Sequence, residues 1–291
     1  MSLSLTAPPL VASPPETASP VSTEVPVVLR TNRLADALAS AGWGAVGFGA
    51  LIALWALAAW RVEQLPTPIA TLAELRHLLA DPFYDRGPND KGIGVLLYNS
   101  LLRVFTGFGL AALVGVPFGL WIGASRRAWM AANPVIQLLR PVSPLAWFPI
   151  WLIVFKDSPR AAVWVIFITS LWPIVVNTAA GAASVPMDQR NVARVFRFGR
   201  VAYVRHILVP HALPSVVTGM RLSMGVAWMV IVAAEMVSST VGIGNYVWDL
   251  YNALKLAKMM AVIVVIGMAG LVLDLLFMRI GRAVAHEGAR P

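Results

Sequence analysis

Long stretches without a charged side chain constrain this chain more than any other feature. No charged residue lies between Asp36 and Arg61, or between Arg103 and Arg126. A helix needs about 20 apolar residues to cross roughly 30 Å of hydrocarbon, because each residue adds about 1.5 Å. Only 13% of the 291 residues are charged, about half the fraction typical of a soluble domain. We therefore predict a membrane protein.

The apolar stretches predict an all-α polytopic fold with about six transmembrane helices. The third stretch contains Pro134, Pro141, Pro144 and Pro149, so we expect it to be kinked or partly re-entrant. The predicted spans are residues 43–60, the stretch from Arg103 to Arg126, residues 133–155, and segments within 161–184, 217–238 and 259–278.

The distribution of Lys and Arg between alternate loops predicts the orientation, because loops rich in these residues face the cytoplasm. Arg126 and Arg127 follow the second span, and five arginines between 190 and 205 follow the fourth. The other loops are balanced or acidic. Both termini are therefore predicted to be cytoplasmic. Dispersed loop arginines also explain the net charge of +9 without a nucleic-acid partner.

The chain ends differ from its centre. Residues 1–29 contain no Lys or Arg and are rich in Pro, Ser and Thr, unlike a signal peptide. We expect residues 1–40 to be a disordered or peripheral cytoplasmic tail, 41–285 the transmembrane domain and 286–291 a C-terminal tail. With no cysteine and four histidines, the sequence favours neither a disulfide framework nor a metal site.

Residues 185–214 form the longest predicted cytoplasmic segment and are too polar to span. We expect a short helix after Pro186 that Asp188 caps and Gly199 ends, followed by a second helix over 201–208 that stops at Pro210. Val192, Val195 and Phe196 share one helix face, which suits either anionic lipid headgroups beside the arginines or a cytoplasmic partner.

Polar residues within the spans are candidates for function, because a charge at the bilayer centre costs about 2.5–3.5 kcal/mol. Glu235 is the only charged residue from 222 to 248, so it must face protein or water. It is either a pore or gate residue or a partner of Arg221 or Arg103. Asp274 lies near a span end, where Arg279 or Arg282 could pair with it.

Small residues recur at every fourth position in the second span. This spacing places them on one helix face, which allows another backbone to approach closely. We predict that the face packs against a neighbouring helix. It consists of Gly107, Ala111, Gly115, Gly119 and Gly123.

The segment 185–214 resembles the cytoplasmic loop of ATP-binding cassette (ABC) importer permeases. Their pattern is Glu-Ala-Ala, three residues, Gly, nine residues, Ile, one residue and Leu-Pro. Ala193, Ile207 and Pro210 match it, whereas Asn191 and Arg197 replace the Glu and the Gly. The pattern falls in order on Asn191, Val192, Ala193, Arg197, Ile207, Val209 and Pro210.

Five further segments resemble the nitrate/nitrite and bicarbonate branch of that family, which also includes cyanate and sulfonate importers. They are DPFYDRGPNDKGIG from Asp81, RPVSPLAWFPIWL from Arg140, WPIVVNTAAG from Trp172, AWMVIVAAEM from Ala227 and VGIGNYVWDLYN from Val241.

The resemblance implies a type I ABC importer permease fold in the bacterial inner membrane. It also implies a homodimer, cytoplasmic ATPase subunits and an extracytoplasmic substrate-binding protein. The chain has no Gly-Lys-Ser/Thr phosphate loop, so it is not expected to be an enzyme or to hold a cofactor. ATP and Mg²⁺ would bind the partner ATPase. The residues implied in coupling are Asn191, Val192, Ala193, Arg194, Arg197 and Gly199.

The resemblance further implies import of a small anion, most specifically nitrate or nitrite, with bicarbonate, cyanate and taurine or other sulfonates as alternatives. A different class, an ion-gradient-driven transporter using Glu235 and Asp274, stays open at this point. Packing, snorkelling or interfacial anchoring would equally explain each polar or aromatic candidate. The candidate pathway residues are Asn177, Thr178, Trp172, Trp228, Glu235, Arg103 and Arg221.

Overall fold

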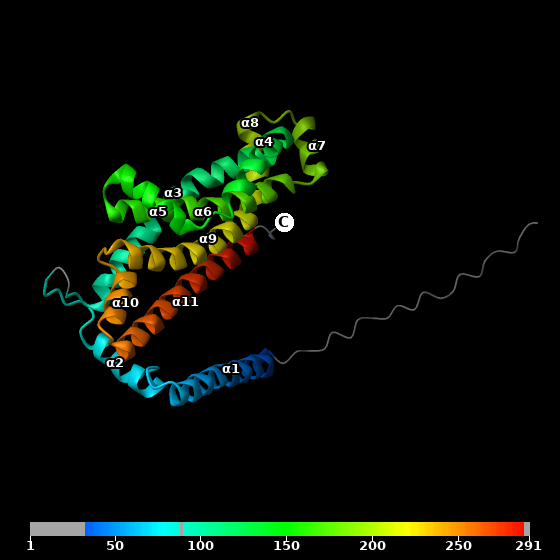
Figure 1. The fold of residues 1–291 in the computed structure, drawn as a ribbon. Coiled ribbons are helices and arrows are strands. Elements are labelled where there is room, and N and C mark those ends of the chain that lie inside the picture. Colours follow the sequence, from blue (N-terminus) through cyan, green and yellow to red (C-terminus); the bar gives the residue numbers. More distant parts are fainter. Residues whose placement is uncertain (1–32, 88–89, 288–291) are drawn as a thin grey trace, which may run out of the picture. The chain divides into compact units, whose positions relative to one another are not determined.

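The computed structural model describes residues 33–87 and 90–287, and these are almost entirely helical (Figure 1). Most of the two predicted tails therefore lies outside the described residues. The helices are α1 (Arg33–Arg61), α2 (Pro68–Ala80), α3 (Ile93–Ala124), α4 (Arg126–Leu139), α5 (Pro144–Phe155), α6 (Ser158–Ala183), α7 (Met187–Val195), α8 (Arg200–Tyr203), the π-helical turn η1 (Val204–Leu208), α9 (Val209–Ser238), α10 (Ile243–Asn252) and α11 (Leu256–Glu287).

The described residues divide into two units, with the boundary between residues 51 and 52, inside α1. Helix α1 begins at Arg33, ahead of the boundary at residue 41 that we predicted from composition. The second unit contains all other helices. Within it, α4, α7 and α8 gather at one end, and α10 and α2 lie at the other (Figure 1).

Five helices of the described chain are long and apolar enough to cross a membrane. A sixth crossing is formed if α4 and α5 count as one broken span, because the two helices meet at a bend of 94°. This bend confirms the predicted interruption of the third span. The second span was placed too late along the chain. Helix α3 begins at Ile93, so Arg103 lies within the helix rather than at its end.

Helices α3, α6 and α9 form the packed centre, and their glycines set the spacing. A Cβ added at Gly107 would lie 2.6 Å from the carbonyl oxygen of Val163, and one at Gly119 would lie 2.7 Å from Cβ of Thr178. Such distances leave no room for any side chain, so the predicted packing face is confirmed against α6. Around it lie fully buried side chains that include Val104, Ile166, Ile174, Met224 and Ile231.

The short helices attach to this centre through aromatic and leucine side chains. Trp151 of α5 stacks on Trp164 of α6 with ring centroids 5.3 Å apart, which fixes the second half of the broken span. Leu78 of α2 is buried in the core, and Leu75 packs against it. Helix α2 is capped by Thr67, whose Oγ1 accepts from Ala70 N–H.

Gly107 and Gly109 provide a matched pair that tests the packing of α3. We expect Gly107→Ala to lower the unfolding temperature, since overpacking costs about 1–3 kcal/mol. Gly109 has nothing within 4 Å of an added Cβ. Gly109→Ala should therefore leave stability equal or raise it by up to about 1 kcal/mol through helix propensity. Equal destabilisation by both variants, measured by thermal unfolding in detergent, would contradict this packing.

Candidate functional site

Helix α7 forms the predicted short helix of the segment 185–214, and its first turn differs from the prediction. Pro186 is the N-cap residue and no side chain caps the helix. Asp188 lies inside the first turn, so it can favour the helix dipole but does not cap, and the predicted cap is wrong. Pro186 suits the N-cap position, with φ −59° and ψ 148°, but its side chain has no acceptor for the N–H groups of the first turn.

The end of α7 is closed by a Schellman motif, in which two N–H groups past the helix return to its last turn. Phe198 N–H donates to the Ala193 carbonyl at 2.9 Å, and Arg197 N–H donates to the Arg194 carbonyl at 3.1 Å. This motif requires a left-handed residue, and Arg197 has φ +50°. Glycine is the residue that adopts this conformation without strain, and the importer pattern has Gly at this position. The turn is thus made with an arginine.

The two faces of α7 differ in burial. Ala193 is 7% exposed and is the buried residue of the helix, so it faces the rest of the chain. Val192, Val195 and Phe196 are 49%, 77% and 70% exposed, so they form an open apolar face. This face defines the part of the segment that is free to contact another molecule. Asn191, Arg194 and Gly199 are exposed as well.

The second half of the segment does not stop at Pro210 as predicted. Residues from Arg200 to Ser238 form one continuous helical stretch of 39 residues. It passes through η1, where Val209 N–H donates to the Val204 carbonyl. This wider turn takes up an extra residue, and Pro210 then lies in the first turn of α9, where the missing N–H is tolerated.

Glu235 of α9 is completely buried and is held by donors from two other helices, α3 and α10. Arg103 Nη1 of α3 donates to its Oε1 at 2.6 Å, and Gly244 N–H of α10 donates to Oε2 at 3.0 Å. Ser100 Oγ lies 2.8 Å from Oε2 and accepts from Ile243 N–H at 3.0 Å. Of the two partners considered, the structure selects Arg103. The carboxylate also receives the positive end of the α10 dipole.

Glycines at the start of α10 allow this close approach. A Cβ at Gly242 would overlap the Glu235 carboxylate, and one at Gly244 would overlap the Val232 carbonyl oxygen. Ser100 and these glycines were not predicted as neighbours of Glu235. The spacing of the two glycines in VGIG is the signal that could have indicated them.

Arg221 of α9 and Asp274 of α11 form a second ion pair within the spans. Arg221 Nε donates to Asp274 Oδ1 at 2.8 Å, and Nη2 donates to Oδ2 at 2.9 Å. We expected Asp274 to pair with Arg279 or Arg282 along its own helix. The bidentate geometry of a guanidinium from the facing helix is more favourable. Arg103 and Arg221 are therefore both fixed by carboxylates rather than snorkelling.

Three of the neutral or aromatic pathway candidates have internal partners or packing. Asn177 Nδ2 donates to the Pro173 carbonyl of its own helix at 2.8 Å. Thr178 is fully buried against Gly119, and its Oγ1 has no partner among the described residues. Trp228 is 5% exposed, and its Nε1 donates to the Ile266 carbonyl at 3.1 Å. In this chain they contribute to packing between helices.

Trp172 differs from these three, because it lines a cavity of about 320 Å³ beside the break between α4 and α5. Arg140 and Ser143 lie at the break itself, and Trp147 and Thr169 also face the cavity. None of the described residues lining it is acidic. Arg140 was not predicted as a candidate, although it directly precedes the first of the two prolines of RPVSP. The cavity can accommodate a small anion beside a guanidinium.

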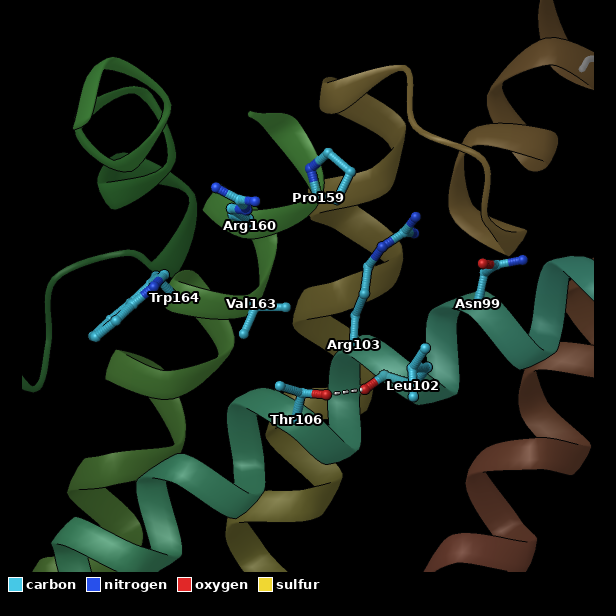
Figure 2. Close-up of a pocket in the computed structure, with 8 residues that line it drawn as sticks. All are labelled: Asn99, Leu102, Arg103, Thr106, Pro159, Arg160, Val163 and Trp164. Atoms are coloured by element: carbon cyan, nitrogen blue, oxygen red, sulfur yellow. Dashed lines mark hydrogen bonds between the residues drawn. The ribbon is translucent and has the colours of Figure 1, made fainter. Parts of the chain in front are cut away.

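A second cavity, of about 400 Å³, lies between α3 and the start of α6 (Figure 2). Figure 2 shows Asn99 and Arg103 projecting from α3, and Arg160 and Trp164 from α6. Arg103 thus belongs both to the buried ion pair and to this cavity wall. Thr106 is occupied by a bond to the Leu102 carbonyl at 2.7 Å. None of the described lining residues is acidic, but Arg103 pairs with Glu235 and Arg160 Nε lies 3.6 Å from Asp157 Oδ2.

The connection between α2 and α3 is ordered by a short turn. Lys91 Nζ donates to Asp85 Oδ2 at 2.5 Å, which lowers the pKa of this exposed carboxyl below its usual value. This pair therefore stabilises the turn above the ordinary carboxyl pKa and is lost as the pH falls. Burial raises the pKa of the neighbouring Tyr84. Among the described residues, no group of three potential ligands could hold a metal ion.

The described residues form five unbroken spans and one broken pair. The amphipathic helix α7 lies between the third and fourth unbroken spans. Residues 115–287 match the family described as binding-protein-dependent transport system inner membrane component. This chain belongs to that family. It is therefore a multi-pass membrane protein and the permease subunit of an ABC importer, a class that works with ATPase and binding-protein partners.

Several relatives in this permease family are similar over most of their length. A nitrate import permease of Synechocystis sp. is 42% identical over 79% of this chain and 84% of its own. A bicarbonate transport permease of Synechococcus elongatus is 42% identical over 72% and 77%. The taurine transport permease of Escherichia coli is 31% identical over 72% and 75%.

Solved structures of permeases confirm the predicted fold. An inward-facing form of the methionine ABC transporter MetNI matches 66% of this chain and 95% of its own, with a TM-score of 0.59 and 16% identity. An amino acid ABC transporter matches with a TM-score of 0.53. The all-α permease fold expected from the sequence is therefore correct.

The left-handed conformation of Arg197 predicts different effects of two substitutions that both remove its charge. Arg197→Gly should stabilise the end of α7 relative to Arg197→Ala by about 1 kcal/mol, because only glycine lacks the Cβ that strains this conformation. Slower hydrogen exchange of the residue-197 and Phe198 amides in the glycine variant would report it. Equal exchange in both variants would show that no strain is stored there.

Removing the charge of Glu235 should destabilise the permease strongly. In Glu235→Gln the shape is kept but Arg103 is left unpaired, at a cost of about 3–5 kcal/mol in thermal unfolding. The double variant Arg103→Gln with Glu235→Gln should recover much of the loss. Asp274→Asn offers a matched control, since its ion pair is about half exposed and should matter less. A loss no greater for Glu235→Gln than for Asp274→Asn would contradict this.

Proposed function

We propose that this permease imports nitrate or nitrite inward, as a homodimer with two cytoplasmic ATPase subunits or domains and an extracytoplasmic binding protein. Both termini face the cytoplasm in this proposal. The observation that carries it is the 42% identity to a nitrate import permease over 79% of the chain. ATP and Mg²⁺ bind the ATPase, and the chain itself performs no covalent chemistry.

The charge arrangement supports an anionic substrate. A bare carboxylate on the pathway would repel an anion, but Glu235 and Asp274 are each paired with an arginine. The cavity at the broken span instead presents Arg140 with no acidic neighbour among its described lining residues. A single exposed guanidinium binds an anion weakly enough to release it, as transport requires.

Bicarbonate is the second candidate substrate. Its support is the bicarbonate transport permease that is also 42% identical, over 72% of the chain. Nitrate and bicarbonate are both small planar monoanions, so an arginine-lined cavity suits either. A sulfonate has weaker support, since the taurine permease is 31% identical.

The proposed ATPase contact is the open face of α7. Val192, Val195 and Phe196 would fill an apolar groove, while Arg194 and Arg197 would pair with acidic groups on the ATPase. Ala193 would contribute indirectly, because its buried side chain holds α7 against the rest of the chain. Asn191 and Gly199 border this contact.

The ion-gradient alternative loses its support. It needs Glu235 and Asp274 to exchange protons with water, whereas Glu235 is fully buried and both carboxylates are ion-paired. Membership in a binding-protein-dependent family also favours ATP as the energy source.

Arg140 provides the test of the anion pathway. The full complex, with its ATPase and binding protein, is placed in nanodiscs and ATP hydrolysis is measured as nitrate, nitrite, bicarbonate and taurine are added in turn. We expect stimulation by nitrate or nitrite. Arg140→Gln should lower stimulated hydrolysis about tenfold or more, because the loss of a contact worth about 1.4 kcal/mol corresponds to a tenfold change. Arg140→Lys should retain part of the stimulation. Stimulation by bicarbonate or taurine alone would overturn the substrate assignment.

Val195 tests the proposed ATPase contact. Val195→Glu places a charge in the apolar face of α7, so we expect loss of ATPase association in pull-down from membranes without loss of permease insertion. Leu254 is the control, because it is similarly exposed, at 79%, and lies in the turn after α10. Helix α10 is at the other end of the unit from α7 (Figure 1). Leu254→Glu should retain the ATPase. Retention by both variants would exclude this face as the contact.

A further inference from the structure

A cavity of about 460 Å³ lies beside α7 and plays no part in the proposed transport or coupling. It is built where two spans end, from the last turn of α3, the first turn of α4 and the last turns of α6. Arg190 of α7 closes one side. The helix ends that form the cavity lie at the end of the unit where α4 and α7 gather (Figure 1).

The cavity lining has an apolar part and a basic part. Gly123, Ala179 and Ala183 contribute to a floor of small residues, and Trp129 adds an apolar wall. Arg126 and Arg190 are the charged residues, and none of the described lining residues is acidic. A ligand complementary to this lining has an anionic group and an adjoining apolar chain.

Arg190 is incompletely bonded. Its Nη2 donates to the Ala183 carbonyl at 3.0 Å, where it satisfies the end of α6. Its Nε is buried and has no acceptor among the described residues. A buried donor without a partner costs about 1–3 kcal/mol, so an acceptor atom in the cavity would be strongly favoured.

Size and position distinguish among anions. A small inorganic anion would leave most of 460 Å³ empty and would not use the apolar floor. Phospholipid phosphates lie at the ends of membrane spans, with acyl chains directed along the helices, and basic pockets between spans are typical headgroup sites. We propose that this cavity binds an anionic phospholipid, with its phosphate on Arg190 and Arg126 and its acyl chain over the alanine floor.

Bound lipid would connect α4 to α7 at the base of the predicted coupling segment. The proposal depends on the spans and not on which anion is transported, so the two can fail separately. Its test needs a probe that reports from this cavity, and Trp129 serves as that probe because brominated acyl chains quench nearby indoles.

The complex is placed in phosphatidylcholine nanodiscs that contain a minor fraction of brominated phosphatidylglycerol or brominated phosphatidylcholine. The quenching of Trp129 is the difference between the unmodified protein and Trp129→Phe. We expect greater quenching by phosphatidylglycerol. The preference for phosphatidylglycerol should fall about fivefold in Arg126→Gln and about fivefold in Arg190→Gln, because one arginine beside an anionic headgroup contributes about that factor.

Arg127 is the matched control, since it is exposed and adjacent to Arg126 but does not line the cavity. Arg127→Gln should keep the preference. Equal loss in Arg127→Gln, or no preference in the unmodified protein, would overturn the proposal. Displacement by inorganic phosphate would also overturn it, because the site would then bind free anions. Arg126→Gln keeps the test decisive if Arg190→Gln fails to fold.

Discussion

The close contact between the backbones of α3 and α6 is the constraint on which the rest of the fold depends. Lipid offers no hydrophobic driving force between helices, so association rests on packing and on polar contacts. Gly107 and Gly119 let α6 approach until no Cβ would fit. Gly181 does the same where α6 meets Ser215 of α9. These contacts fix the end of α6 and the start of α9, and α7 lies in the segment that connects these two ends.

Two ion pairs also join these helices, and they leave neither Glu235 nor Asp274 unpaired within the spans. Glu235 joins α3, α9 and α10 through Arg103 and backbone donors, and Asp274 joins α11 to α9 through Arg221. The arginine at the broken span, Arg140, is left to face a cavity. Within the described spans, these two carboxylates are therefore each paired with an arginine, whereas Arg140 lines a cavity with no acidic residue among its described lining.

Features set by composition and periodicity could be predicted from the sequence. The spans, the broken third span and the packing face of α3 follow from uncharged stretches, prolines and a four-residue spacing. The two intramembrane carboxylates were found, because charges within spans are rare. Their partners were harder to predict, since residues as far apart as Arg103 and Glu235 meet only through tertiary packing. The partner of Asp274 was assigned to the wrong helix for the same reason.

Local backbone geometry was the other source of error. Pro210 was expected to end a helix, but a π turn carries the helix past it. Ala193 is among the residues implied in coupling, and the register of α7, which the sequence alone does not show, buries its side chain within the chain. The left-handed conformation of Arg197 is shown by its backbone φ angle and not by its residue type, although the importer pattern has Gly at that position. The substrate followed from resemblance and not from any of these features.

Uptake of labelled nitrate into proteoliposomes, driven either by ATP or by an ion gradient, tests the central claim most directly. The complex of this permease with its ATPase and binding protein should accumulate nitrate when ATP is supplied on the ATPase side, and a proton or sodium gradient alone should drive none. Gradient-driven uptake by the permease without its ATPase would contradict the account.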